Sequence, residues 1–111
     1  MTAQTILIVD DELTLRDVVR RYLELDGFRV VEAGSGPEAL AALRDKHIDL
    51  ILLDIMLPGL DGFSITRSLR YSPEFSGTGR GAAIPIIILT SRGDETDRIL
   101  GFELGVDDYV I

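Results

Sequence analysis

The stretch ILIVDDE at residues 6–12 is the part of the sequence that decides the fold. Its apolar residues run from Ile6 to Val9 without polar alternation, which is typical of a strand buried on both faces of a parallel sheet covered by helices. Comparable runs occur at Leu50–Leu53, Ile84–Leu89 and Tyr109–Ile111, and a shorter β-branched candidate is found at Phe28–Val31. The sequence therefore predicts five buried strands.

Amphipathic helical patterns lie between these runs. Leu15, Val18, Val19 and Tyr22 recur at helical spacing and predict one apolar face. The opposite face is filled by the charged residues Arg16, Asp17, Arg20, Arg21 and Glu24. Gly27 stands where this helix is expected to end.

Three further helices are predicted along the chain. Ser35-Gly36-Pro37-Glu38 has the spacing of a capping box ahead of the helix-forming run at 39–43. The other two helices are expected at Leu60–Leu69 and Glu95–Leu104. The Gly/Ser-rich segment Tyr71–Ala83 follows a helix rather than a strand, so it predicts a surface insertion and not a phosphate-binding loop. The alternation of strands and helices predicts a doubly wound α/β fold with right-handed crossovers.

Composition narrows the class of protein. The 111 residues and the 46% hydrophobic content fit one folded domain spanning residues 1–111. The absence of cysteine and the single histidine, His47, exclude a disulfide scaffold, Cys-ligated metal and a multi-histidine site. The net charge of −8 argues against binding of nucleic acid by this segment. No apolar stretch approaches the ~20 residues of a membrane span, and no signal peptide is visible, so a cytoplasmic location is expected.

Acidic and hydroxyl residues follow three of the predicted strands. Asp10, Asp11 and Glu12 come after the first run, Asp54 comes after Leu53, and Thr90 and Ser91 come after Leu89. Ligands of open parallel sheets bind at the carboxyl ends of the strands, so these side chains are expected to converge if the first and third strands are neighbours. Taken singly, each has an ordinary alternative as a helix cap or turn residue.

Taken together, the carboxylates favour a magnesium site. Two carboxylates about 5 Å apart repel by roughly 3 kcal/mol at an effective dielectric constant of about 20. A divalent cation offsets this cost, and Mg²⁺ prefers hard oxygen ligands and commonly bridges carboxylates to a phosphate. The sequence thus predicts a magnesium site that serves phosphoryl chemistry.

Four motifs together resemble the receiver domain of bacterial two-component response regulators, over nearly the whole chain. They are ILIVDDE at 6–12, DLILLDIMLPGLDGF at 49–63, PIIILTSR at 85–92 and DETDRILGFELGVDDYV at 94–110. The last motif is most similar to the winged-helix (OmpR/PhoB) type. The resemblance implies a flavodoxin-like parallel sheet with strand order 2-1-3-4-5.

The resemblance also implies roles for individual residues. Asp54 is similar to the phosphoacceptor that takes a phosphoryl group from a histidine kinase, with no enzymatic activity beyond self-phosphorylation and autodephosphorylation at that residue. Asp11 and Asp54 would ligate Mg²⁺, Asp10 would act mostly through water, and the backbone carbonyl of Met56 would be a further ligand. Thr90 resembles the switch hydroxyl and Tyr109 the switch aromatic. Pro58 and Gly59 resemble the turn after the acceptor strand.

The family pattern continues past the position at which this sequence stops. It places a lysine three residues after the switch aromatic, then a proline and a fifth helix, whereas the sequence stops at Ile111. On this basis we expect a truncated domain with impaired phosphorylation. We also expect partly uncovered side chains at Leu15, Val18, Val19 and Tyr22, and self-association, for which exchange of elements between chains is one route. Sedimentation as a clean monomer at high concentration would contradict the last point.

The winged-helix type implies two further partners. DNA would be bound only by a C-terminal effector that regulates transcription and is absent from this sequence. Arg98, Asp107 and Asp108 resemble charged positions of the dimer face formed by the fourth helix, fifth strand and fifth helix.

Of two alternative functions, the sequence argues strongly against the first, and the second stays open. An aspartyl-phosphate hydrolase of the haloacid-dehalogenase type needs a second acid two residues after the nucleophile, where this chain has Met56. A phosphorylation-incompetent interaction module with the receiver fold is the other alternative, because the family's lysine is missing. Hydrolysis by a Ser/His/Asp arrangement is disfavoured, since His47 is expected on the solvated surface.

Overall fold

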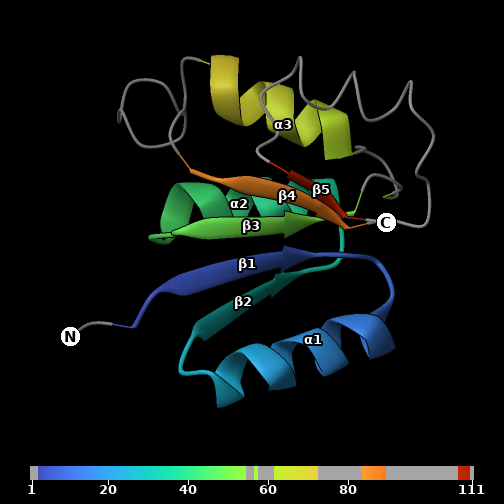
Figure 1. Cartoon of the computed structure of the whole chain (residues 1–111). Coiled ribbons are helices and arrows are strands. Elements are labelled where there is room, and N and C mark those ends of the chain that lie inside the picture. The colour runs from blue at the N-terminus through green and yellow to red at the C-terminus, as the bar shows by residue number, and fades with distance from the viewer. Residues whose placement is uncertain (1–2, 55–56, 58–61, 73–83, 90–107, 111) are drawn as a thin grey trace.

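A five-stranded parallel sheet organises the computed structural model, which describes residues 3–54, 57, 62–72, 84–89 and 108–110 (Figure 1). The strand order is β2-β1-β3-β4-β5, as predicted, and every neighbouring pair is parallel. The strands are β1 (Thr5–Val9), β2 (Arg29–Ala33), β3 (Leu50–Leu53), β4 (Ile86–Leu89) and β5 (Asp108–Val110).

The strand ends differ from the predicted ones for two reasons. β2 runs to Ala33 because it pairs with β1 over its whole length, from Thr5↔Arg29 to Val9↔Ala33. β4 begins at Ile86 rather than Ile84, and the preceding Pro85 has no N–H to donate to a ladder. β3 coincides with the predicted Leu50–Leu53.

The first helix, α1 (Leu13–Leu25), ends in a Schellman motif. The N–H of Gly27 donates to the carbonyl of Glu24 at 3.0 Å, and that of Phe28 donates to Leu23 at 3.1 Å. Gly27 has a φ of +91°, which L-residues with a side chain rarely adopt. Its predicted role at the end of the helix is confirmed.

The second and third described helices are α2 (Gly36–Asp45) and α3 (Gly62–Tyr71). Ser35 caps α2, since its Oγ accepts from the N–H of Glu38 at 3.3 Å. In a capping box, the side chain of Glu38 would accept a hydrogen bond from the N–H of Ser35. Here Glu38 Oε2 accepts instead from the N–H of Gly34. Tyr71 belongs to α3 and not to the predicted insertion, whose residues 73–83 lie outside the described part, as does the predicted helix at 95–104.

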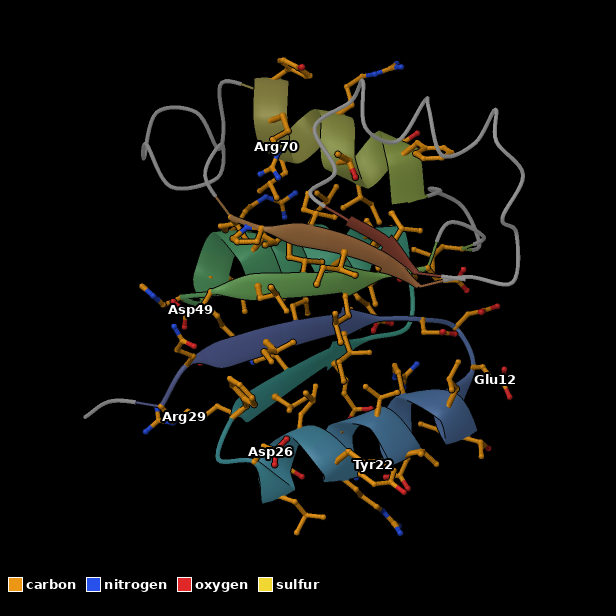
Figure 2. All side chains as sticks on the ribbon, viewed as in Figure 1. Glu12, Tyr22, Asp26, Arg29, Asp49 and Arg70 are labelled. Carbon is orange, nitrogen blue, oxygen red and sulfur yellow. The ribbon has the colours of Figure 1, made fainter. Side chains whose placement is uncertain are left out.

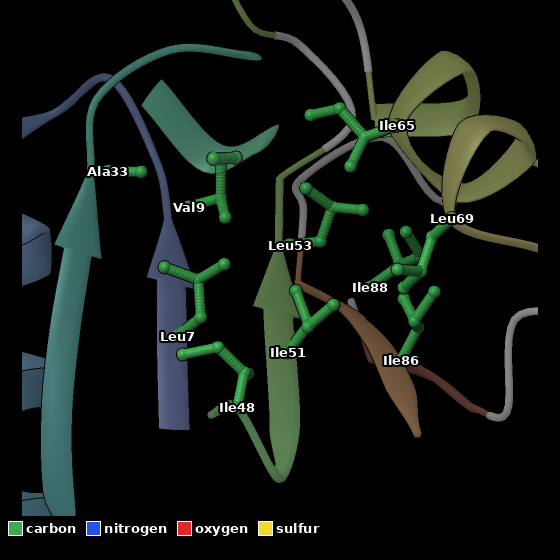
Figure 3. Packing of buried hydrophobic residues seen from close by; sticks show 11 residues of the cluster. Leu7, Val9, Ala33, Ile48, Ile51, Leu53, Ile65, Leu69, Ile86 and Ile88 are labelled. Carbon is green, nitrogen blue, oxygen red and sulfur yellow. The ribbon is translucent and has the colours of Figure 1, made fainter. Parts of the chain in front are cut away.

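The hydrophobic core lies between one face of the sheet and the helices α2 and α3 (Figure 3). β1, β3 and β4 contribute alternate residues, and α2 and α3 contribute Ala39, Ile65 and Leu69. Each of these side chains is at most 1% exposed. The strand residues of this core are Leu7 and Val9 of β1, Ala33 of β2, Ile51 and Leu53 of β3, and Ile86 and Ile88 of β4.

The opposite face of the sheet carries α1, which packs against β1 and β2 (Figure 1). Ile6 and Ile8 are buried on this face, so β1 is buried on both sides as predicted. α1 itself has no buried residue, and several of its apolar side chains are exposed, as was expected of Leu15, Val18 and Tyr22.

The charged face of α1 is only partly exposed to solvent. The side chain of Arg16 is only 15% exposed, and those of Arg20 and Asp17 are 33% exposed. These groups pair with one another or with Glu32, so a charged cluster contacts the edge strand β2.

Among the described residues, no helix has the length and apolar character that crossing a membrane requires.

Candidate functional site

The carboxyl ends of β1 and β3 lie level with each other. Val9 is paired with Leu53, so the next residues, Asp10 and Asp54, lie side by side at the carboxyl-terminal end of the sheet. Backbone hydrogen bonds continue past the strands on both sides. The N–H of Asp54 donates to the carbonyl of Val9 at 2.9 Å, and that of Asp10 donates to Ala33 at 3.1 Å.

Three carboxylates gather at this edge. Asp10, Asp11 and Asp54 each offer one carboxylate oxygen, and these oxygens all lie within 4.8 Å of one another. Asp10 is buried, with 8% of its surface exposed, whereas Asp54 is half-buried and Asp11 is exposed. The predicted convergence of the acids after the first and third strands is thus present.

The turn from β1 into α1 is held by its own polar groups. The N–H of Glu12 donates to Asp10 Oδ1 at 2.8 Å, so Glu12 acts here through its backbone. Figure 2 shows Glu12 at the end of the sheet where α1 begins. Arg16 Nη1 donates to the main-chain oxygen of Asp10 at 2.7 Å, a contact that was not predicted from the sequence.

Several predicted site residues cannot be placed. Met56, Pro58, Gly59 and Thr90 lie outside the described residues, as do Arg98 and Asp107 of the predicted dimer face. Tyr109 belongs to β5, where its backbone is level with Ile88 of β4, and Asp108 is the first residue of that strand. Their side chains are not described.

His47 lies away from the acidic cluster. Its side chain is 62% exposed, and Nε2 is 2.9 Å from Asp49 Oδ1. Asp49 precedes β3 and lies at the opposite end of the sheet from Glu12 (Figure 2). The prediction that His47 is a surface residue is confirmed, so the described part of the site offers oxygen ligands only.

The donor set fits a hard divalent cation. Three carboxylate oxygens from two adjacent loops can approach one ion, and their mutual repulsion is relieved when they do so. Mg²⁺ is bound in proteins by one or two carboxylates with several retained waters. Asp11 is exposed, so at least one carboxylate of the cluster is in contact with water.

Comparison with known proteins gives the family. The model of the response regulator receiver domain matches residues 6–111. The transcriptional regulatory protein ResD of Bacillus subtilis is 43% identical over 106 residues, which is 96% of this chain and 40% of ResD. AfsQ1 of Streptomyces coelicolor is 39% identical over 107 residues, which is 96% of this chain and 44% of AfsQ1. The chain thus spans about two-fifths of the length of these regulators.

Solved structures agree with the fold. Chemotaxis protein CheY4 of Vibrio cholerae has a TM-score of 0.87 at 25% identity, over 99% of this chain and 87% of the other. The receiver domain of sensor histidine kinase PA1611 from Pseudomonas aeruginosa has a TM-score of 0.82 at 33% identity, over 98% and 84% of the two chains. That structure is described as having a magnesium ion coordinated in the active site cleft. This chain belongs to the response regulator receiver domain family.

Proposed function

We propose that this chain is a phosphoacceptor signalling domain in which Asp54 receives a phosphoryl group. The observation that carries the proposal is the meeting of Asp10, Asp11 and Asp54 within 4.8 Å at the carboxyl ends of β1 and β3. Asp54 is held at this edge by the hydrogen bond from its N–H to Val9, so its carboxylate is presented by a rigid strand end.

The same cluster would hold Mg²⁺. Asp11 and Asp54 are proposed as ligands, with Asp10 acting mostly through water and the carbonyl of Met56 as a further ligand. When bound, the ion neutralises charge on the phosphoryl oxygens and so lowers the repulsion against an attacking carboxylate. The donor set supports this choice, because it contains hard oxygen atoms only.

The proposed donor of the phosphoryl group is a histidine kinase. An oxygen of Asp54 forms the new bond to phosphorus while the bond from phosphorus to the kinase imidazole nitrogen breaks, and that nitrogen takes up a proton. Water later cleaves the acyl phosphate to release inorganic phosphate and restore the Asp54 carboxylate. Positioning and charge stabilisation are the main contributions a protein makes to phosphoryl transfer. Thr90 and Tyr109 are proposed to respond to the phosphoryl group as switch residues.

The proposed partners follow from the relatives. ResD and AfsQ1 are transcriptional regulatory proteins, which supports an OmpR/PhoB-type regulator acting in the cytoplasm through a DNA-binding effector. We also propose that the chain associates with itself. It is supported by exposed apolar residues on α1, among them Leu15 and Val18 at 45% and Tyr22 at 69%.

The mass of the intact chain tests the acceptor chemistry. The chain is incubated with Mg²⁺ and a small-molecule phosphodonor, in parallel with Asp54→Asn. We expect one added phosphoryl group in the wild type, none in the variant, and none in the wild type when a chelator replaces Mg²⁺. A wild-type chain that binds Mg²⁺ without becoming phosphorylated would contradict the proposal and favour a phosphorylation-independent interaction module.

A further inference from the structure

Arg16 connects three elements around the acidic turn. It lies in the first half of α1, yet its side chain is only 15% exposed. Nη1 donates to the main-chain oxygen of Asp10 at 2.7 Å, and Nε donates to Glu32 Oε1 on β2 at 3.1 Å. One planar guanidinium thus joins the end of β1, the start of α1 and the edge strand β2.

The contacted oxygen belongs to the residue where the acidic turn begins. The N–H of Asp10 is bound to Ala33, its Oδ1 accepts from Glu12, and its carbonyl accepts from Arg16. The last bond fixes the peptide plane between Asp10 and Asp11. A rotation of that plane would change the direction in which both carboxylates leave the backbone.

The charge of Arg16 is balanced locally. Glu32 pairs with Arg16 through Oε1, and its Oε2 lies 3.2 Å from Arg20 Nε. The carboxylate of Glu32 neutralises the positive charge of the guanidinium. Arg16 therefore acts on the acidic cluster by orienting a peptide group, and not by placing a positive charge beside the carboxylates. Arg's rigid fork suits a residue that must serve two acceptors at once.

We infer that Arg16 is a positioning residue for the acidic cluster, and that it holds the Asp10–Asp11 peptide in the orientation in which their carboxylates bind Mg²⁺. The inference rests on the proposed function, since it takes the cluster to be a magnesium site. Groups that orient metal ligands without touching the metal commonly change metal affinity by 10–100-fold when they are removed.

Gly34 provides an independent way to move Arg16. A Cβ added at Gly34 would lie 2.9 Å from Arg16 Nη1, closer than real Cβ contacts. The obstructing atom is the end of a flexible side chain, so Gly34→Ala can be accommodated by displacing the guanidinium. That displacement lengthens or bends the 2.7 Å bond to Asp10 while leaving the residue type at position 16 unchanged.

The experiment measures Mg²⁺ affinity and thermal stability separately. Isothermal titration with Mg²⁺ gives Kd for the wild type, Arg16→Met, Arg16→Lys, Gly34→Ala and Arg20→Met, and melting without Mg²⁺ gives Tm. We expect Kd to rise roughly tenfold in Arg16→Met, with a smaller rise in Arg16→Lys and a clear rise in Gly34→Ala.

Arg20→Met is the matched control. This variant removes the same charge and the other arginine partner of Glu32. The Arg20 side chain pairs with Asp17, Glu24 and Glu32, and these contacts do not involve Asp10. We expect its Kd to stay within about twofold of the wild type, a change of at most about 0.4 kcal/mol. Equal losses of affinity in the two arginine variants would assign the effect to charge and overturn the inference.

The remaining outcomes separate the inference from the proposed function. A lower Tm in Arg16→Met with unchanged Kd would mean that Arg16 only stabilises the fold, and the inference would be wrong while the magnesium site stands. If Arg16→Met does not fold, an unchanged Kd in Gly34→Ala would have the same meaning. Absence of Mg²⁺ binding by the wild type would overturn the proposed function and, with it, the inference.

Discussion

The two faces of the sheet are built from different interactions. On the face covered by α2 and α3, apolar side chains such as Leu53, Ile65 and Leu69 are fully buried against one another. On the face covered by α1, Ile6 and Ile8 are buried, but the helix contacts the sheet edge through charged groups and leaves apolar ones exposed. Among the described residues, the first face holds most of the fully buried apolar side chains, whereas the second holds the turn that carries the carboxylates.

The largest expected effect comes from breaking the apolar face. Ile65→Ala removes a fully buried side chain from the contact between α3 and the sheet and should lower the free energy of unfolding by about 2–5 kcal/mol. Val18→Ala on α1 is the control, because Val18 is 45% exposed, and it should stay within about 0.5 kcal/mol. Urea unfolding without Mg²⁺ measures both, and similar losses would show that the two faces do not differ as described.

The N-termini of α1 and α2 allow a second test, in which an intermediate change in the free energy of unfolding is expected. Ser35 caps α2 through its side chain, whereas Glu12, the corresponding residue of α1, makes no side-chain cap bond. Ser35→Ala should therefore cost about 1 kcal/mol, and Glu12→Ala only a few tenths. Urea unfolding again provides the comparison. A larger loss in Glu12→Ala would mean that its carboxylate stabilises α1 by a route other than a cap bond.

The smallest expected effect concerns acid stability on the α1 face. The side-chain hydrogen bond from Arg20 lowers the pKa of Asp17 below its ordinary value, and Arg21 adds to this. A carboxyl group with a lowered pKa stabilises the folded state above its ordinary pKa of about 4, and this contribution is lost as the pH falls through the folded value. Asp17→Asn should thus weaken the fall of stability in acid.

Arg20→Met should reduce the same acid dependence without abolishing it, because it removes the main donor that lowers the pKa of Asp17 but leaves the ion pair with Arg21. Denaturant unfolding between pH 2 and pH 7 measures the slope in both variants. An unchanged slope in Asp17→Asn would show that its ion pairs do not persist in solution, as is common for exposed pairs.

The sequence was sufficient for the fold because its strongest signals are local and agree with one another. Apolar runs marked the five strands, Gly27 marked the end of α1, and the capping residue Ser35 marked the start of α2. The acids after β1 and β3 could be grouped because parallel strands bring their carboxyl ends to one edge. The family resemblance then supplied the strand order that made those two strands neighbours.

The role of Arg16 could not be read from the same signals. Helical periodicity sorts residues by hydropathy, so it placed every charged residue of α1 on one face without indicating what that face contacts. The direction of Arg16 is decided by Glu32, a charged residue in the otherwise apolar strand β2, and by the carbonyl of Asp10. Both contacts depend on how α1 lies against the sheet. A glutamate within a β-branched strand, at VVEA (30–33), is the one local sign of such a partner.

The level pairing of Val9 with Leu53 makes the site sensitive to strand length rather than to strand composition. A substitution within β1 or β3 changes packing but leaves Asp10 and Asp54 side by side. Deletion of one residue from either strand would draw the following aspartate back by about 3.3 Å and turn it to the other face of the sheet. Variation in this protein's lineage should therefore include many exchanges among Ile, Leu and Val in these strands, but no insertion or deletion between the strand starts and the two aspartates.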